Sequence, residues 1–263
     1  MQSTLLHAAG AHALRILFVG NSLLNFNDVP ATVAKMLQSD GSGRAVTESH
    51  VFVGHLEDVA PGSATDREVR SGKFDVVVLQ AAMVSSSGKI SYPQTRAIAM
   101  AKAARTKGSR TLLYVEWPRR GVDETAFTLG VYRGIAQASG AELLPVCDAW
   151  NAVLAAEPKF ELWSPDGNHA LPLGSYLAAC CVYFRLAGVQ RTPAYVPAGL
   201  DAQKARTVLE RCRAQEKDLR TRRELVWPPE HAPPFEKSAR GRRIVGSGAV
   251  RKSIRGPSSS ELW

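Results

Sequence analysis

Five short apolar runs, rich in β-branched residues, recur about 25 to 40 residues apart along this chain. Four of them carry no charge at their centres, which is typical of strands buried on both faces of a sheet. Helical patterns separate the runs, and such an alternation predicts a parallel sheet with right-handed crossovers. The predicted strands are residues 15–19, 48–53, 74–79, 111–116 and 142–146, and the predicted helices are residues 29–38, 94–107, 125–139 and 173–186.

The alternation predicts an α/β fold: a three-layer α/β/α sandwich of the flavodoxin-like type with about five parallel strands. The chain has 263 residues, of which 45% are hydrophobic, so a sizeable core is expected. We expect this domain to span residues 15–200, after an N-terminal extension of residues 1–14. A charged helix is predicted at residues 201–226. The Pro-, Arg- and Ser-rich composition of residues 227–263 is typical of a disordered tail.

The positive charge is concentrated at the C-terminal end of the chain. Residues 201–263 hold 15 Lys/Arg and 8 Asp/Glu and so contribute +7 of the net charge of +9, leaving +2 for residues 1–200. The predicted domain therefore need not favour an acidic partner. The basic end stays open as an arm for nucleic acid or a membrane surface, although it lacks the interleaved aromatic residues typical of nucleic-acid binding.

The four cysteines have neither the spacing of a metal site nor that of a disulfide framework. Cys180 and Cys181 are adjacent in an apolar helical pattern and are interpreted as small core residues. This usage is consistent with a reducing compartment. Residues 4–14 match a signal peptide poorly, so a cytoplasmic location is expected. No apolar run approaches the roughly 20 residues that a membrane span needs.

Chemistry-bearing residues follow each predicted strand. In an open parallel sheet, ligands bind outside the carboxyl ends of the strands, which form one edge. We therefore expect these residues to meet at that edge. In order of the strands they follow, the residues are Ser22, Gly54, Gln80 and Trp117, with Asp166 and His169 in the connection after the fifth strand.

Ser22, His169 and Asp166 supply a hydroxyl, an imidazole and a carboxylate, the three groups of a serine hydrolase. In this interpretation His169 takes the proton of Ser22, and Asp166 orients the imidazole. Two structural alternatives stay open. Ser22, Asn21 or Asn25 can cap the next helix, and Asp166 can cap a helix or turn. No Gly-x-Ser-x-Gly motif lies near Ser22, which excludes the α/β-hydrolase arrangement.

Gly54 and Gln80 are the other candidates for catalytic chemistry. With the backbone N–H of Ser22, the Gly54 N–H and the Gln80 amide can form an oxyanion hole. Gly54 can equally be an ordinary turn glycine, and Gln80 can simply bond the loop backbone. Trp117 is a candidate for the substrate pocket and is expected to lie half in the core and half in the pocket wall.

These residues resemble the SGNH (GDSL-like) hydrolase superfamily. Gly20-Asn21-Ser22 is similar to its first block, Gly54 to the second-block glycine, and Asp166-Gly167-Asn168-His169 to the fifth block. The likeness covers about residues 14–188. It implies the α/β/α fold, with Ser22 as nucleophile, His169 as base and Asp166 as acid.

Gln80 stands where the third block usually has an asparagine, as in branches that resemble sialate O-acetylesterases and related carbohydrate esterases. The resemblance implies hydrolysis of small acyl esters, such as acetylated sugars, without metal or cofactor. One departure is that Ala81-Ala82-Met83 follows Gln80, where an acidic residue and a serine are expected. The alternative is therefore a catalytically degenerate protein of the same fold that binds a sugar or an ester.

Overall fold

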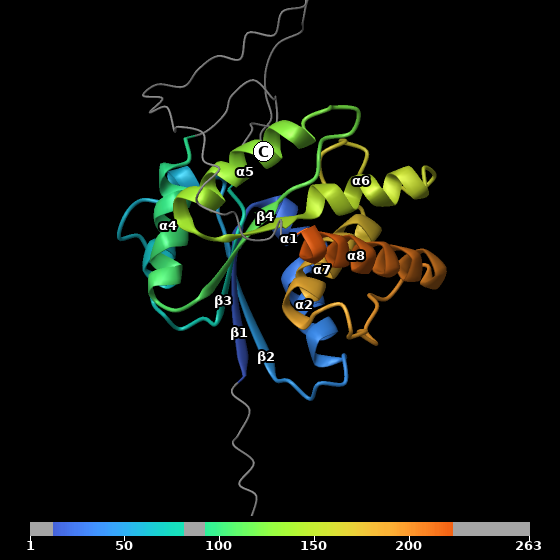
Figure 1. Ribbon diagram of the computed structural model, residues 1–263, viewed down its shortest axis with the longest axis horizontal. Helices are drawn as coiled ribbons and strands as arrows, with labels where there is room; N and C mark the ends of the chain where they lie inside the picture. The colour runs from blue at the N-terminus through green and yellow to red at the C-terminus, as the bar shows by residue number, and fades with distance from the viewer. Residues whose placement is uncertain (1–12, 82–92, 223–263) are drawn as a thin grey trace, which may run out of the picture.

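The computed structural model describes residues 13–81 and 93–222. A five-stranded sheet with strand order β2-β1-β3-β4-β5 forms its centre (Figure 1), and all neighbouring strands are parallel. This confirms the predicted sheet. The strands are β1 (Leu14–Gly20), β2 (Val46–Phe52), β3 (Val76–Leu79), β4 (Arg110–Val115) and β5 (Glu142–Pro145). The predicted tail, residues 227–263, and most of the predicted extension lie outside the described residues.

Helices cover both faces of the sheet, with α4 and α5 on one side and α2 and α7 on the other (Figure 1). The helices are α1 (Ser22–Asn25), α2 (Val29–Gln38), α3 (Ala64–Val69), α4 (Thr95–Thr106), α5 (Thr125–Ser139), α6 (Val146–Ala156), α7 (Pro172–Ala187) and α8 (Ala202–Arg222), with 3-10 turns η1 (Phe26–Asp28) and η2 (Leu56–Asp58). Within the described ranges, none of these helices has the length and apolarity needed to cross a membrane.

The β1 strand shows why the fold has two cores. Ile16 and Phe18 pack into the cluster that contains α2 and α7, whereas Leu17 and Val19 pack into the cluster with α4 and α5. All four side chains are fully buried. Because successive side chains of a strand point to opposite faces, a strand covered on both faces must be apolar at every position, as the sequence of β1 is. The burial of each such side chain contributes about 1.5–3 kcal/mol.

The β2 strand lies at one edge of the sheet and is correspondingly more polar. It pairs with β1 alone, and Thr47, Ser49 and His50 are exposed. An edge strand with little cover need not be apolar on both faces. This position explains why β2 alone among the predicted strands carries polar residues through its centre.

Helix α6 was not predicted, and it forms the first part of the connection that follows the fifth strand. β5 ends at Pro145 and α6 begins at once at Val146, so Ala149 and Trp150 are helical and buried. The signal was present in the sequence, because Val146, Ala149, Trp150 and Val153 have the helical spacing i, i+3, i+4 and i+7. The absence of a turn between strand and helix concealed it.

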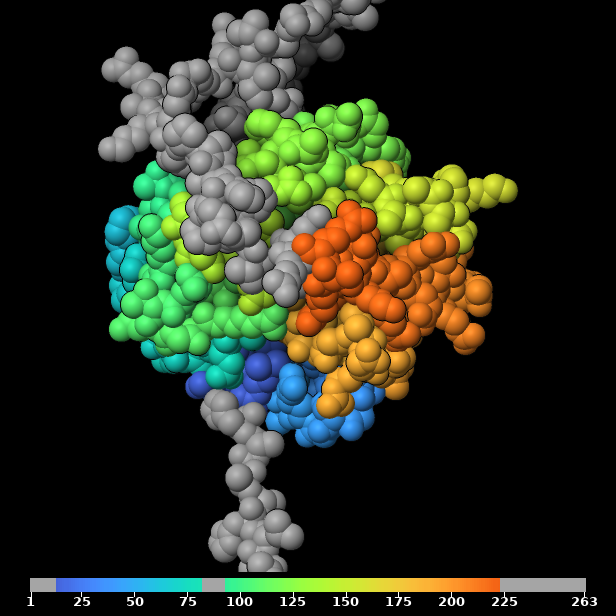
Figure 2. All heavy atoms as spheres, in the orientation of Figure 1, coloured from blue at the N-terminus to red at the C-terminus, as the bar shows by residue number. Residues whose placement is uncertain are grey.

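The predicted charged helix corresponds to α8, which packs across α7 beside α6 (Figure 2). Its buried face includes small residues such as Ala205 and Cys212 as well as Leu209 and Leu219. All four cysteines of the chain are buried and free, as expected for Cys180 and Cys181 from the sequence. The helix is therefore part of the globular unit.

A buried ion pair fixes α8 to α7. The guanidinium of Arg185 is fully buried and donates to both carboxylate oxygens of Glu216, at 2.9 and 3.0 Å. Arg185 also donates to the carbonyl oxygen of Leu143 in β5, and Arg220 donates to Glu216 at 2.8 Å. The Glu216 carboxylate on α8 thus neutralises the charge of Arg185 on α7, which is also hydrogen-bonded to β5.

We expect Glu216→Gln to lower the free energy of unfolding by about 3–5 kcal/mol, because it leaves the Arg185 charge buried without a counterion. Urea unfolding measures the effect. Glu210→Gln on the same helix is the matched control, because its partner is the more exposed Arg213 and such pairs contribute about 1 kcal/mol or less. Equal losses in the two variants would contradict this account of α8.

Candidate active site

The nucleophile candidate lies at the junction of β1 and α1. The side chain of Asn21 caps α1 by accepting a hydrogen bond from the Leu23 N–H at 2.9 Å. Ser22 is the first residue of the helix, so its hydroxyl is not used for capping. The structure therefore favours the alternative in which Asn21 caps, and the Ser22 hydroxyl is available to another partner.

That partner is His169. The Oγ atom of Ser22 lies 2.8 Å from Nε2 of His169, a normal hydrogen-bond distance. On the other side of the ring, Nδ1 lies 2.5 Å from Oδ2 of Asp166. The side chains of His169 and Asp166 are 27% and 48% exposed, so this line of three groups is open to solvent and to a small ligand.

Asp166 forms hydrogen bonds both within its own turn and with the imidazole of His169. Its Oδ1 atom accepts hydrogen bonds from the hydroxyl of Ser164 and from the backbone N–H groups of Asn168 and His169. Its Oδ2 atom faces His169. The two interpretations from the sequence are thus compatible, because each carboxylate oxygen takes one role. His169 precedes α7, which begins at Pro172, so the turn itself brings the carboxylate to the ring.

The charge state of Asp166 follows from these contacts. The hydrogen bond with the His169 side chain, followed by that from the Ser164 hydroxyl, holds the pKa of the Asp166 carboxyl well below its ordinary value. The carboxylate is therefore ionised at neutral pH. An ionised acceptor keeps the proton of the imidazole on Nδ1, which leaves Nε2 as the acceptor for the Ser22 hydroxyl.

The loop after β4 holds the turn of Asp166 and His169 in place. Trp117 Nε1 donates to the carbonyl oxygen of Asn168 at 2.9 Å, and the Arg120 N–H donates to that of Gly167 at 2.8 Å. The Arg120 guanidinium also donates to the carbonyl oxygens of Trp163 and Ser164. These bonds reach both ends of the turn, so the loop limits its movement.

The structure gives Trp117 a role that differs from the predicted one. Its side chain is only 3% exposed, and its ring stacks on that of Trp150 at a centroid distance of 4.5 Å. It therefore lies in the core beneath the turn and forms no open pocket wall. The sequence shows that an aromatic residue follows the strand, but not that the indole points inward.

Gln80 lies directly beneath the first block. It is fully buried, and its Oε1 atom accepts a hydrogen bond from the Asn21 N–H at 3.1 Å. Its Nε2 atom has no partner among the described residues. A Cβ atom at Gly20 would lie 2.7 Å from Oε1, so the glycine of Gly-Asn-Ser is needed to admit this amide. One end of the amide thus bonds the loop, as one interpretation predicts, and the other end has no partner within residues 13–81 and 93–222.

Gly54 follows β2 at the same level of the sheet at which Ser22 follows the neighbouring strand β1. Gly20 and Phe52 are paired in the sheet, and the Val53 N–H donates to the carbonyl oxygen of Gly20. Ser22 and Gly54 each follow two residues after that pair. The backbone of Gly54 has no positive φ, and nothing lies within 4 Å of a Cβ atom built there. The fold alone therefore does not require a glycine at this position.

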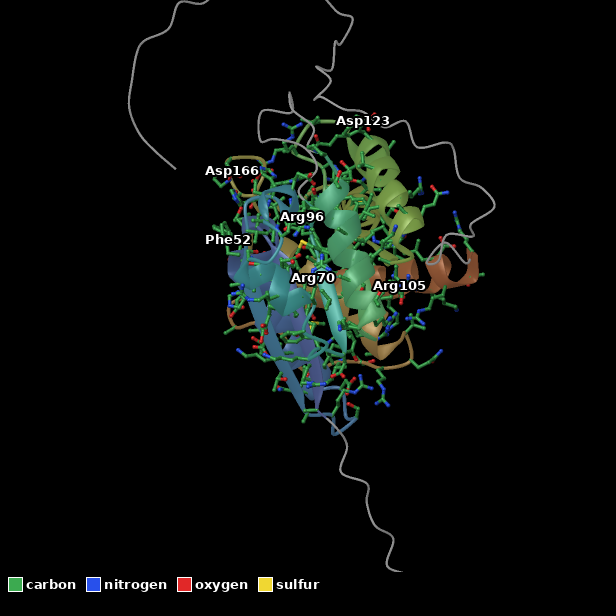
Figure 3. The ribbon with its side chains drawn as sticks, turned by 90° about the vertical axis from the view of Figure 1, so that its left-hand side faces the viewer. Phe52, Arg70, Arg96, Arg105, Asp123 and Asp166 are labelled. Carbon is green, nitrogen blue, oxygen red and sulfur yellow. The ribbon has the colours of Figure 1, made fainter. Side chains whose placement is uncertain are left out.

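A cavity of about 340 Å³ that is open to solvent borders Gly54. Its polar lining comes from His55, Asp58, Ser63 and Thr65, and the rest is contributed by small apolar residues. Phe52, at the end of β2, is 65% exposed. Figure 3 shows Phe52 on the same side of the molecule as Asp166 and away from Arg105.

Two further residues at the site were missed from the sequence. The Phe26 ring lies 5.1 Å from that of His169 and is 48% exposed. The Asn27 side chain donates to the carbonyl oxygen of Ala170 at 3.0 Å. Only their closeness to Ser22 in the sequence pointed to them. Across residues 13–81 and 93–222, no group of three or more His, Cys, Asp or Glu side chains could hold a metal ion.

Comparison with known proteins supports the same fold. No protein-family model and no curated protein matches the chain. A structure from Slackia heliotrinireducens assigned to the SGNH hydrolases is 26% identical, has a TM-score of 0.50, and is matched over 65% of this chain and 97% of that one. The chain thus has the fold of the SGNH hydrolase superfamily.

Two other solved structures share this SGNH fold at lower identity. A DUF4886 family protein from Bacteroides uniformis ATCC 8492 has a TM-score of 0.58 and 15% identity, with 78% of this chain and 95% of that one covered. A protein from Parabacteroides merdae ATCC 43184 assigned as a GDSL-like lipase has a TM-score of 0.52 and 13% identity, with 67% and 96% covered. These matches do not single out the sialate O-acetylesterase-like branch, which stays a prediction.

We expect Asp166→Asn to abolish the hydrogen bond that fixes the imidazole. The N–H groups of Asn168 and His169 will hold the amide oxygen at the Oδ1 position, so the NH2 group, which cannot accept, will face Nδ1 of His169. In proton NMR spectra, the His169 Nδ1 proton of the wild type should give a strongly deshielded resonance that this variant lacks. Ser164→Ala is the control, because it removes a bond to Oδ1 and leaves Oδ2 free to accept from His169. Persistence of the resonance in Asp166→Asn would contradict the geometry.

Proposed function

We propose that this SGNH-fold protein is a serine esterase that hydrolyses small acyl esters through an acyl-enzyme. The observation that carries the proposal is the line of contacts from Ser22 Oγ to His169 Nε2 and from His169 Nδ1 to Asp166 Oδ2. A nucleophile, a base and a group that orients the base, all within hydrogen-bond reach, are the arrangement that acyl transfer requires. The hydrolase neighbours with the same fold are consistent with it.

In the first half of the reaction, Ser22 Oγ attacks the carbonyl carbon of the ester while its proton passes to His169 Nε2. The tetrahedral intermediate then collapses. The bond to the alcohol oxygen breaks, and His169 gives the proton to that oxygen as the alcohol leaves. Asp166 stays ionised and stabilises the imidazolium during these steps. In the second half, His169 takes a proton from water, the hydroxide oxygen attacks the acyl-enzyme, and Ser22 recovers its proton.

The developing negative charge needs donors at the other side of the carbonyl. We assign this role to the backbone N–H groups of Ser22 and Gly54 and to the Nε2 amide of Gln80. The Nε2 group, which has no partner in the described part of the chain, supports the assignment, because a buried donor without a partner costs about 1–3 kcal/mol. The cost is removed when substrate binds, because the oxygen of the substrate then accepts a hydrogen bond from Nε2. Each donor of this kind typically contributes about 100- to 1000-fold to turnover.

The substrate class follows from the space around these groups. We propose that the alcohol part of the ester occupies the cavity beside Gly54, where Asp58, Ser63 and Thr65 can bond hydroxyl groups. This polar lining favours a hydroxyl-bearing alcohol such as a sugar, in agreement with the predicted carbohydrate esterase branch. The exposed carboxylate of Asp58 disfavours an anionic alcohol.

The alternative is a binding protein of the same fold whose oxyanion hole has lost its function, and it rests on the departure of Ala81-Ala82-Met83 from the pattern of the branch. Ala82 and Met83 lie outside the described residues. This alternative predicts binding of a sugar or ester without reaction at Ser22. The proposal that the basic C-terminal end binds nucleic acid or a membrane surface concerns residues that lie mostly outside the described ranges.

The purified protein should release p-nitrophenol from p-nitrophenyl acetate, and Ser22→Ala should reduce this release at least about 1000-fold. A fluorophosphonate probe should label Ser22 in the wild type, because the reagent reacts with an activated serine. Ser42→Ala, in the loop before β2, is the control and should keep full activity. Equal activity of wild type and Ser22→Ala would remove Ser22 from the mechanism, and absence of labelling with retained ligand binding would favour the binding protein.

We expect Gly54→Ala to leave the melting temperature unchanged, because the added methyl group meets no atom of the protein. The methyl group should instead crowd the bound ester. A cost of about 1–3 kcal/mol for overpacking corresponds to a decrease in kcat/KM of about 5- to 150-fold. Esterase assays with thermal melts separate the two effects.

Gly134→Ala on α5 is the matched control for Gly54→Ala. Its Cβ atom also meets nothing, and alanine favours a helix over glycine by about 1 kcal/mol. We expect this variant to have unchanged kcat/KM and equal or greater stability. An unchanged kcat/KM in Gly54→Ala would mean that the substrate does not approach Gly54.

A further inference from the structure

Ser22 and His169 lie 147 positions apart in the sequence. Asn27 bridges the two segments that carry them. Asn27 lies in the η1 turn just after α1. Its Nδ2 group donates to the carbonyl oxygen of Ala170 at 3.0 Å and to the hydroxyl of Ser175 at 2.9 Å. Ala170 directly follows His169, and Ser175 lies in the first turns of α7. One side chain thus ties the segment that follows the nucleophile to the backbone that carries the base.

The backbone conformation of Asn27 suits this bridge. Its φ and ψ angles are 52° and 26°, in the left-handed region, and the next residue, Asp28, also has a positive φ of 53°. Asparagine tolerates this region better than most residues with a side chain. A glycine would adopt the same backbone more readily but would supply no donor. The fold therefore accepts an unfavourable conformation where a side-chain amide can reach α7.

Two other contacts join the segment after Ser22 to the segment that carries His169 and α7. The Ser175 hydroxyl, which is 3% exposed, donates to the carbonyl oxygen of Phe26 at 3.3 Å. The Phe26 ring packs against the His169 ring at 5.1 Å. Phe26, Asn27 and Ser175 thus connect the segment that follows Ser22 with the segment that carries His169 and α7.

We propose that Asn27 is a positioning residue that sets the alignment of Ser22 with His169, with Ser175 as its partner on α7. This inference rests on the proposed function. Proton transfer between Oγ and Nε2 requires their separation to stay near the observed 2.8 Å, and a misplacement of about 1 Å can cost about 100-fold in rate. Asn27 itself touches neither of the two reacting side chains, so it acts only through the backbone of residues 27 and 170.

The test is Asn27→Gly, which keeps the left-handed backbone accessible and removes both donors. Asn27 is exposed, so the change opens no cavity in the core. We expect kcat for p-nitrophenyl acetate to fall about 10- to 100-fold with KM and the melting temperature little changed. Fluorophosphonate should label the variant more slowly yet to the same final extent. A purely structural defect would instead lower the final extent, because part of the protein would be unfolded.

Asp28→Gly is the matched control. It changes the neighbouring left-handed residue, whose side chain caps α2 by accepting from the Ala31 N–H and makes no hydrogen bond to α7 within the described residues. The activity of this variant should therefore equal that of the wild type. Ser175→Ala should lower kcat in the same direction as Asn27→Gly, and the double variant should be less impaired than the product of the two effects.

The outcomes separate this inference from the proposed function. If wild-type Ser22 is labelled and Asn27→Gly reacts at the wild-type rate, the positioning role is wrong and the esterase stands. If Asp28→Gly is slowed as much as Asn27→Gly, the effect belongs to the backbone of the turn, and the role of the Asn27 amide is likewise overturned. If wild-type Ser22 is not labelled at all, both proposals fail together.

Discussion

The hydrogen bond between Ser22 and His169 joins residues 147 positions apart, and the rest of the site is arranged around it. The two residues meet only because the sheet places their segments at the same edge. Ser22 follows β1, the strand that separates β2 from the β3-β4-β5 side, and the strand order reverses at this point. In open α/β sheets, ligands bind outside the carboxyl ends of the strands at such a reversal. The turn of Asp166 and His169 reaches this edge of the sheet, because His169 bonds Ser22 there.

The contacts that hold this alignment mostly run from a polar side chain to a backbone atom. Gln80 bonds the backbone of Asn21, Trp117 bonds that of Asn168, and Asn27 bonds that of Ala170. A backbone atom within a turn has few ways to move, so each bond fixes the path of the chain as well as one group. Groups that act on a substrate gain precision from such a supporting shell. The buried pair of Arg185 and Glu216 serves the fold in a similar way, because it fixes α8 to α7.

Much of this architecture could be predicted from the sequence, because it depends on periodicity and on position along the strands. The buried strands required apolar residues on both faces, and the rule on strand ends brought Ser22 to the same edge as His169. Features that depend on orientation could not be predicted. The indole of Trp117 turns inward to bond a turn 51 residues away, and Asn27 reaches α7 only because of its left-handed backbone. The branch of the superfamily and the substrate likewise stay predictions, since they depend on the shape of a pocket.

The central claim is that Ser22 forms a covalent bond with the acyl group. The most direct measurement is rapid quenching of the wild-type protein in acid during turnover of p-nitrophenyl acetate, followed by mass spectrometry of its peptides. Our account predicts one acetyl group on the peptide that contains Ser22, which disappears as the substrate is exhausted. Release of p-nitrophenol at a steady rate with unmodified Ser22, or acetylation of a different residue that matches the turnover rate, would contradict it.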